Sequence, residues 1–98
     1  KMKAEIFNSY ATAIAQEFNI TEEDLFTKTK RRHIVDARYL LYFACFERPM
    51  RVVYIQEYMK ERGYKVAHSN VLHGIGEIEK RLEYDRDYNK LLVKLKKN

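Results

Sequence analysis

The chain has 98 residues, a formal net charge of +5 and a hydrophobic content of 46%. This length suits one small domain, and the apolar content is sufficient for a packed core, which excludes a disordered tail. The single cysteine excludes an internal disulfide framework. No apolar run reaches the roughly 18 residues needed to span a bilayer, and no signal peptide precedes the first predicted helix, so we expect a cytoplasmic protein without membrane contact.

The first two predicted helices cover residues 3–18 and a short segment that begins at residue 21. In the first, apolar residues recur at helical spacing, as expected for an amphipathic helix. These residues are Ile6, Phe7, Tyr10, Ala11, Ile14 and Phe18. The second helix begins with the capping-box-like sequence TEED and should direct Leu25 and Phe26 inward.

The third predicted helix, about residues 31–47, is apolar nearly all round between Tyr39 and Phe46. Such a helix is normally the central, buried one. Cys45 lies in this run, so we expect a buried, reduced thiol rather than a reactive one. Pro49 ends the helix and can start the next one.

Three more helices are predicted in the second half of the chain. One covers about residues 50–62 and stops before Gly63, the next begins near His68, and Asp85 or Asp87 caps the last. Their inward apolar residues are Val52, Ile55, Met59, Val71, Ile75, Ile78, Leu82, Tyr88, Leu91, Leu92 and Leu95. Because no segment alternates like a strand, residues 1–98 predict a single all-α domain, a compact bundle of about six helices.

Positive charge is concentrated in residues 27–38, which contain five basic residues and one acidic residue. Most of them lie in TKTKRRH, residues 27–33, which we interpret as a loop that leads into the third helix. The basic residues are Lys28, Lys30, Arg31, Arg32 and Arg38. A concentrated basic segment is typical of a protein that faces a polyanion, and a solvated loop without a partner is the alternative.

The fourth and fifth predicted helices, joined by a short turn that contains glycine, follow the helix-turn-helix pattern. In that motif the second helix enters the major groove of DNA, and its first residues contact base edges. His68, Ser69 and Asn70 occupy this first turn, and all three side chains can hydrogen-bond to bases. Lys65, in the preceding turn, joins the candidate DNA-binding residues. Ser and Asn are also good N-cap residues, so a purely capping role stays open.

Three segments resemble the C-terminal DNA-binding domain, domain IV, of the bacterial replication initiator DnaA. They are RRHIVDARYLLYFACFE, AHSNVLHGIGEIEKRL and DRDYNKLLVKL, in the family's order and at near-expected spacing over residues 6–95. The tripeptide VLH with a following IEK is fairly specific. The resemblance implies a Trp-repressor-like helix-turn-helix fold that binds double-stranded DNA in replication initiation or its regulation, in a bacterial or phage-infected cytoplasm.

The resemblance also implies roles for individual residues. His68 matches the base-reading histidine of the family, and Ser69 and Asn70 match the two threonines that follow it. Arg38 matches an arginine that contacts DNA, and Lys30 or a neighbour matches the arginine of the minor groove. If Met2 is the natural start, the chain is a free-standing domain, as in a phage or mobile-element protein; an origin within a larger initiator is the other reading.

Two departures from the family pattern bear on specificity. Val66-Ala67 stands where the family has Arg-Asp, and Phe46 stands where it has a lysine expected to touch phosphate. We therefore expect DNA binding to persist and recognition of the DnaA box itself to be lost. The alternative is a protein-interaction domain that binds a replication or host regulatory protein through Tyr54, Tyr58 and Tyr64.

Other chemistry is not expected. The sequence lacks the phosphate-binding pattern GxxxxGK[ST], so we predict no nucleotide partner and no cofactor. His68 and His73 are five positions apart and diverge on a helix, so no metal site is expected. No catalytic constellation occurs, and we predict that the protein is not an enzyme. We expect His73 to pack behind the fifth helix, and Gly74 and Gly76 to let another helix approach closely.

Overall fold

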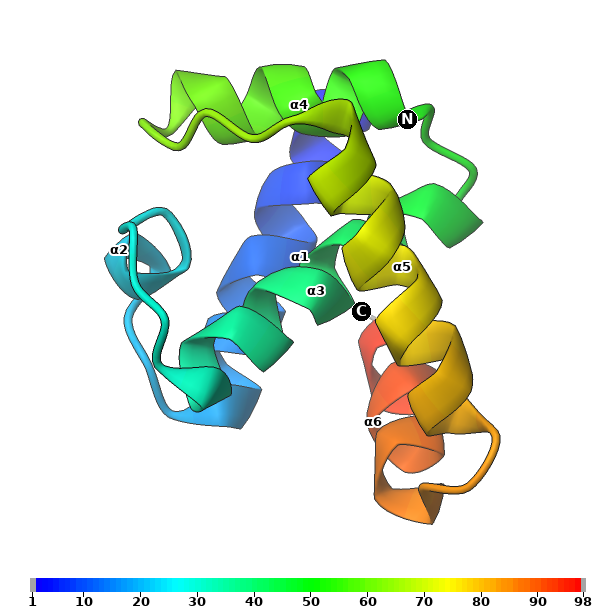
Figure 1. Ribbon diagram of the computed structural model, residues 1–98. Coiled ribbons are helices and arrows are strands. Elements are labelled where there is room, and N and C mark those ends of the chain that lie inside the picture. The colour runs from blue at the N-terminus through cyan, green and yellow to red at the C-terminus, as the bar shows by residue number, and fades with distance from the viewer. Residues whose placement is uncertain (1, 98) are drawn as a thin grey trace.

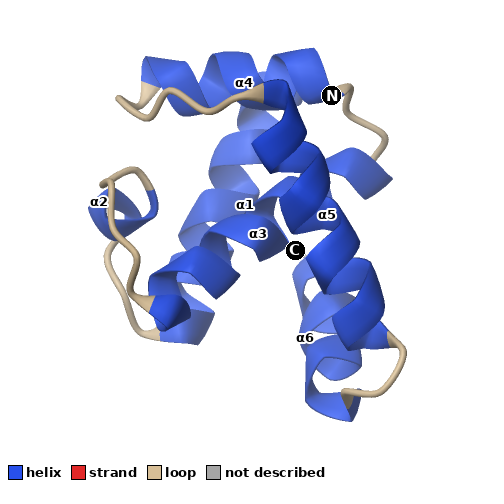
Figure 2. Cartoon of the chain, in the orientation of Figure 1, coloured by secondary structure: helices blue, strands red, loops and turns tan. Residues whose placement is uncertain are grey.

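The computed structural model describes residues 2–97 and forms six helices in that range (Figures 1 and 2). The helices are α1 (Lys3–Phe18), α2 (Glu22–Leu25), α3 (Arg32–Glu47), α4 (Val52–Glu61), α5 (His68–Leu82) and α6 (Arg86–Lys96). No strand occurs among the described residues. The predicted all-α bundle of about six helices is confirmed. No helix in this range is long and apolar enough to cross a bilayer.

The central helix is α3, which packs against both α1 and α5. Leu40 and Leu41 are fully inaccessible to solvent, and the apolar run ends at Phe46, which is 40% exposed. Cys45 is a buried, free cysteine, as predicted. Burial raises the pKa of its thiol to about 12, with Arg48 lowering it in part, so the thiol is neutral near pH 7.

Local sequence determines where α2 and α6 begin. Thr21 accepts a hydrogen bond from the backbone N–H of Asp24 (3.1 Å), and the Asp24 carboxylate accepts one from the backbone N–H of Thr21 (3.0 Å). This is the predicted capping box. Of the two candidate caps for α6, Asp85 is the one used, because its carboxylate accepts from the backbone N–H groups of Asp87 and Tyr88.

Residues 62–67 connect α4 to α5, and the two helices pack against each other (Figure 1). Gly63 has a φ of 93°, a left-handed conformation that glycine adopts without a steric penalty. The backbone N–H groups of Gly63 and Tyr64 donate to the carbonyl groups of Lys60 and Met59, each at 2.9 Å. These bonds end α4 and direct the chain toward α5.

Gly74 lies where α5 crosses α3. A Cβ atom at Gly74 would be 2.7 Å from Cδ1 of Tyr39 and 3.0 Å from Cδ2 of Tyr42, so the predicted close approach is confirmed there. The same prediction is wrong for Gly76, where an added Cβ would meet no atom within 4 Å. The His73 ring meets Tyr39 edge-on with centroids 5.7 Å apart, yet the residue remains exposed, so it packs against α3 only in part.

Candidate nucleic-acid interface

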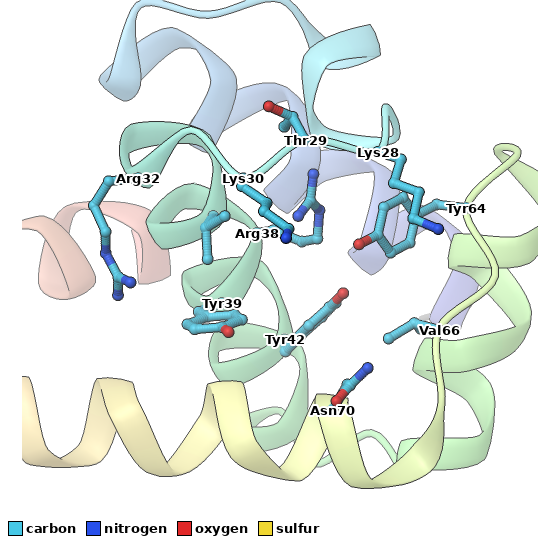
Figure 3. Close-up of a pocket in the computed structure, with 11 residues that line it drawn as sticks. Lys28, Thr29, Lys30, Arg32, Arg38, Tyr39, Tyr42, Tyr64, Val66 and Asn70 are labelled. Carbon is cyan, nitrogen blue, oxygen red and sulfur yellow. The ribbon is translucent and has the colours of Figure 1, made fainter.

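A groove with a volume of about 690 Å³ lies between the basic loop, residues 27–31, and the N-terminal part of α5 (Figure 3). Its lining includes five of the predicted DNA-binding residues: Lys28, Lys30, Arg32, Arg38 and Asn70. Three tyrosines, Val35, Val66 and Thr29 complete the walls. The fold thus brings the basic loop and the first turn of α5 to opposite sides of one groove, although about 40 residues separate them in the sequence.

The remaining predicted residues lie at the surface. Arg31, immediately before α3, is exposed. His68 and Ser69 are exposed in the first turn of α5. Lys65 is also exposed, but it lines a separate, smaller depression of about 300 Å³ beside α4. All four side chains are therefore accessible to a large partner.

The first turn of α5 is not capped by a side chain. Its N-cap residue is Ala67, which has no side-chain hydrogen-bonding group, and Asn70 and Val71 donate their backbone N–H groups to the Ala67 carbonyl. Ser69 and Asn70 lie inside the helix, so the interpretation that they serve as N-cap residues is wrong. Their exposed side chains are available for another partner, at the end of the helix that carries partial positive charge.

Arg38 is buried, with only 3% of its surface exposed, although the sequence predicts a DNA contact for it. Its Nε atom donates to the carbonyl of Leu25 (2.9 Å), and its Nη2 atom donates to the carbonyl of Thr27 (2.8 Å). The guanidinium group also lies 4.4 Å from the centroid of the Tyr64 ring. Arg38 therefore joins four segments: α3, the end of α2, the start of the basic loop, and the turn before α5.

The charge of Arg38 has no carboxylate partner among the described residues. Carbonyl oxygens and an aromatic face balance it only partially, and a buried charge without a counterion is unfavourable. Because Arg38 also lines the groove, its positive charge favours an anion there.

A second arginine, which was not among the predicted site residues, connects the turn to α1 and α2. Arg62 forms an ion pair with Glu22 (3.1 Å) and donates to the side-chain oxygen of Asn8 (3.0 Å). Its guanidinium group lies 4.3 Å from the centroid of the Phe26 ring. Since Phe26 immediately precedes the basic loop, Arg62 helps to fix the loop relative to α4 and α5. Its position at the end of α4 gave no signal of these distant partners.

Arg32 is oriented at the other end of the loop. Its Nε atom donates to the Asp36 carboxylate (3.1 Å), which also pairs with Arg81 of α5 at 3.8 Å. An exposed ion pair of this kind adds little to stability, but it restricts where the Arg32 side chain can point. Asp36 thus holds a cation at the edge of the groove.

Comparison of this chain with protein-family models, curated proteins and solved structures finds no match. The resemblance to domain IV of DnaA therefore stays a prediction. Among residues 2–97, no group of three or more His, Cys, Asp or Glu side chains is arranged to hold a metal ion.

Proposed function

We propose that this domain binds double-stranded DNA in a sequence-specific manner. In this proposal the first turn of α5 enters the major groove, with His68, Ser69 and Asn70 at base edges. The basic loop contacts the backbone and the adjacent minor groove. As in the DnaA domain IV that it resembles, the domain would act in replication initiation or its regulation.

One observation carries this proposal: exposed cations and an uncapped, polar helix start lie on opposite sides of the same groove. Lys28, Lys30 and Arg32 provide charge for phosphates, which supplies most of the affinity of DNA-binding proteins. The exposed side chains of α5 provide hydrogen-bonding groups of the kinds that distinguish bases. Non-specific attraction and sequence readout are thus both accounted for.

A protein-interaction domain is the second candidate. The exposed Phe46 side chain favours it, because an apolar group stands at the position where the family has a phosphate-contacting lysine. The three tyrosines named for this function have contacts within the chain. Tyr58 packs near Phe7 (5.5 Å between centroids), Tyr64 lies against Arg38, and Tyr54 lies under the Lys3 ammonium group (5.0 Å). Tyr58 and Tyr64 are partly buried, which favours the DNA-binding proposal, whereas Tyr54 is 37% exposed and remains accessible to a partner.

The proposal is tested by selecting a random pool of duplex DNA on the purified domain at 50 and 150 mM salt and sequencing what is retained. We expect a defined motif that differs from the DnaA box, because Val66-Ala67 replaces the family's Arg-Asp. Retention at low salt without a motif would limit the function to non-specific binding. No retention at either salt would contradict DNA binding and favour the protein-interaction candidate.

Asn70→Ala is expected to relax sequence preference more than it lowers affinity. The Asn70 side chain is exposed in the first turn of α5, and a well-placed amide distinguishes bases by about 1–3 kcal/mol. The measurement is the affinity for the selected motif and for single-base variants of it. Lys28→Gln serves as the contrast, since the loss of a phosphate contact weakens binding to every sequence alike. Equal losses on all sequences for Asn70→Ala would show that it does not read a base.

A further inference from the structure

Tyr42 places a hydroxyl group in the groove without a partner. It lies on α3, is only 1% exposed, and lines the groove between the basic loop and α5. Among the described residues, none forms a hydrogen bond with this hydroxyl, and none has a fully buried side-chain oxygen without a partner, so the Tyr42 oxygen itself reaches the groove surface. In Figure 3 it points toward the space bounded by Arg38, Tyr64 and Asn70. A hydroxyl that reaches the groove surface and has no partner within the protein is available to hydrogen-bond a ligand there.

The charge around this hydroxyl specifies the kind of ligand. Burial raises the pKa of Tyr42 above its ordinary value, although Arg38 lowers it in part, so the phenol stays protonated and is a donor. Arg38, also buried, lines the same groove without a carboxylate partner among the described residues. Lys28 and Lys30 line its loop side. A hydroxyl donor among three cations suits an oxyanion such as phosphate.

We infer that the groove is a phosphate-binding site in which the Tyr42 hydroxyl donates to a backbone phosphate of bound DNA. This inference rests on the proposed function. A domain that contacts the major groove with α5 and the neighbouring minor groove with the basic loop must straddle the strand between those two grooves. The groove lies between these two elements, and its volume of about 690 Å³ is large enough for a phosphate and its flanking sugars.

The test compares Tyr42→Phe with the unchanged protein on the selected duplex. A hydrogen bond to a charged group has a large net contribution, so we expect Tyr42→Phe to weaken binding about tenfold or more. The dependence of affinity on salt should stay the same, because the phenol is neutral and its loss releases no additional counterion. The melting temperature should also stay the same, since the hydroxyl has no protein partner among residues 2–97.

Tyr10→Phe is the matched control. Tyr10 is also a buried phenol, but it belongs to α1 and does not line the groove. This substitution should leave DNA affinity unchanged. Replacing single phosphates of the duplex by neutral methylphosphonates then identifies the contact. At one position, the replacement should weaken the unchanged protein and have little further effect on Tyr42→Phe.

A second measurement separates this inference from the proposed function. Deoxyadenosine monophosphate is added to the domain while the NMR signals of groove residues are followed. If the unchanged protein binds duplex DNA and Tyr42→Phe binds it equally well, the inferred contact between Tyr42 and a phosphate is contradicted. The proposed function is then still supported. If no duplex binds but the mononucleotide shifts these signals in a Tyr42-dependent way, the groove still binds phosphate, whereas the proposed function and the contact with DNA are overturned. Loss of stability in Tyr42→Phe, or no response to either ligand, overturns the inference.

Discussion

Replacing Arg38 by alanine is expected to lower the free energy of unfolding by about 2–4 kcal/mol and the melting temperature by roughly 10–20 °C. The substitution removes two hydrogen bonds from a charged donor and leaves the carbonyl groups of Leu25 and Thr27 without this partner. It also removes the contact with the Tyr64 ring, which is worth about 0.5–2 kcal/mol. Thermal unfolding followed by circular dichroism measures the change.

Arg31→Ala provides the control for the loss of one positive charge. Arg31 is exposed immediately before α3, so its replacement should change stability by no more than about 0.5 kcal/mol. Arg38→Lys should restore only part of the lost stability, because one ammonium group cannot reproduce the planar fork of donors or its stacking on tyrosine. If Arg38→Ala unfolds at the same temperature as Arg31→Ala, Arg38 does not hold the loop and the turn together.

The helices were predictable from sequence because their causes are local. Apolar residues at helical spacing indicate α1, α4 and α5 before any tertiary contact is known. The capping groups at Thr21 and Asp85 act within three residues of themselves, and Gly63 ends α4 through bonds to the last turn of that helix. The local amino-acid sequence is therefore sufficient to predict where these helices begin and end.

The environment of the arginines was not predictable, because it depends on distant partners. Arg62 pairs with Glu22 and Asn8, which lie 40 and 54 positions away in the sequence. Arg38 looks like a surface cation in the sequence, yet two carbonyl groups and an aromatic face make its burial tolerable. The packing of Gly74 and Gly76 was not predictable for the same reason. They are two positions apart on α5, and only Gly74 faces α3.

The sequence therefore predicted which residues form the candidate site better than it predicted how those residues are arranged. The clustered charge of residues 27–32 and the polar start of α5 identify both sides of the groove. Tyr42 gave no such signal, since a tyrosine within an apolar helix is normally a core residue. Its free hydroxyl becomes visible only when α3, α5 and the loop are placed together.

Binding to the selected duplex is expected to weaken on the order of a hundredfold between 50 and 200 mM salt. This follows if about four phosphates are neutralised, which gives a slope of log K against log salt between roughly −3 and −4. The four cations are Lys28, Lys30, Arg31 and Arg32, all of them exposed. Replacing Lys28 and Lys30 together by glutamine should make the slope less steep by about 2, because two fewer counterions are released. Titrations at four or more salt concentrations measure the slope.

Arg86→Gln with Lys90→Gln is the matched control, since it removes the same charge from exposed residues of α6 that do not line the groove. If attraction depends on contacts made by the loop, this pair should leave the slope unchanged while the loop pair reduces it. Equal reductions by both pairs would mean that overall charge, rather than the groove, attracts DNA. A flat salt response of the unchanged protein would remove the electrostatic basis of the proposed function, because phosphate contacts cannot form without releasing counterions.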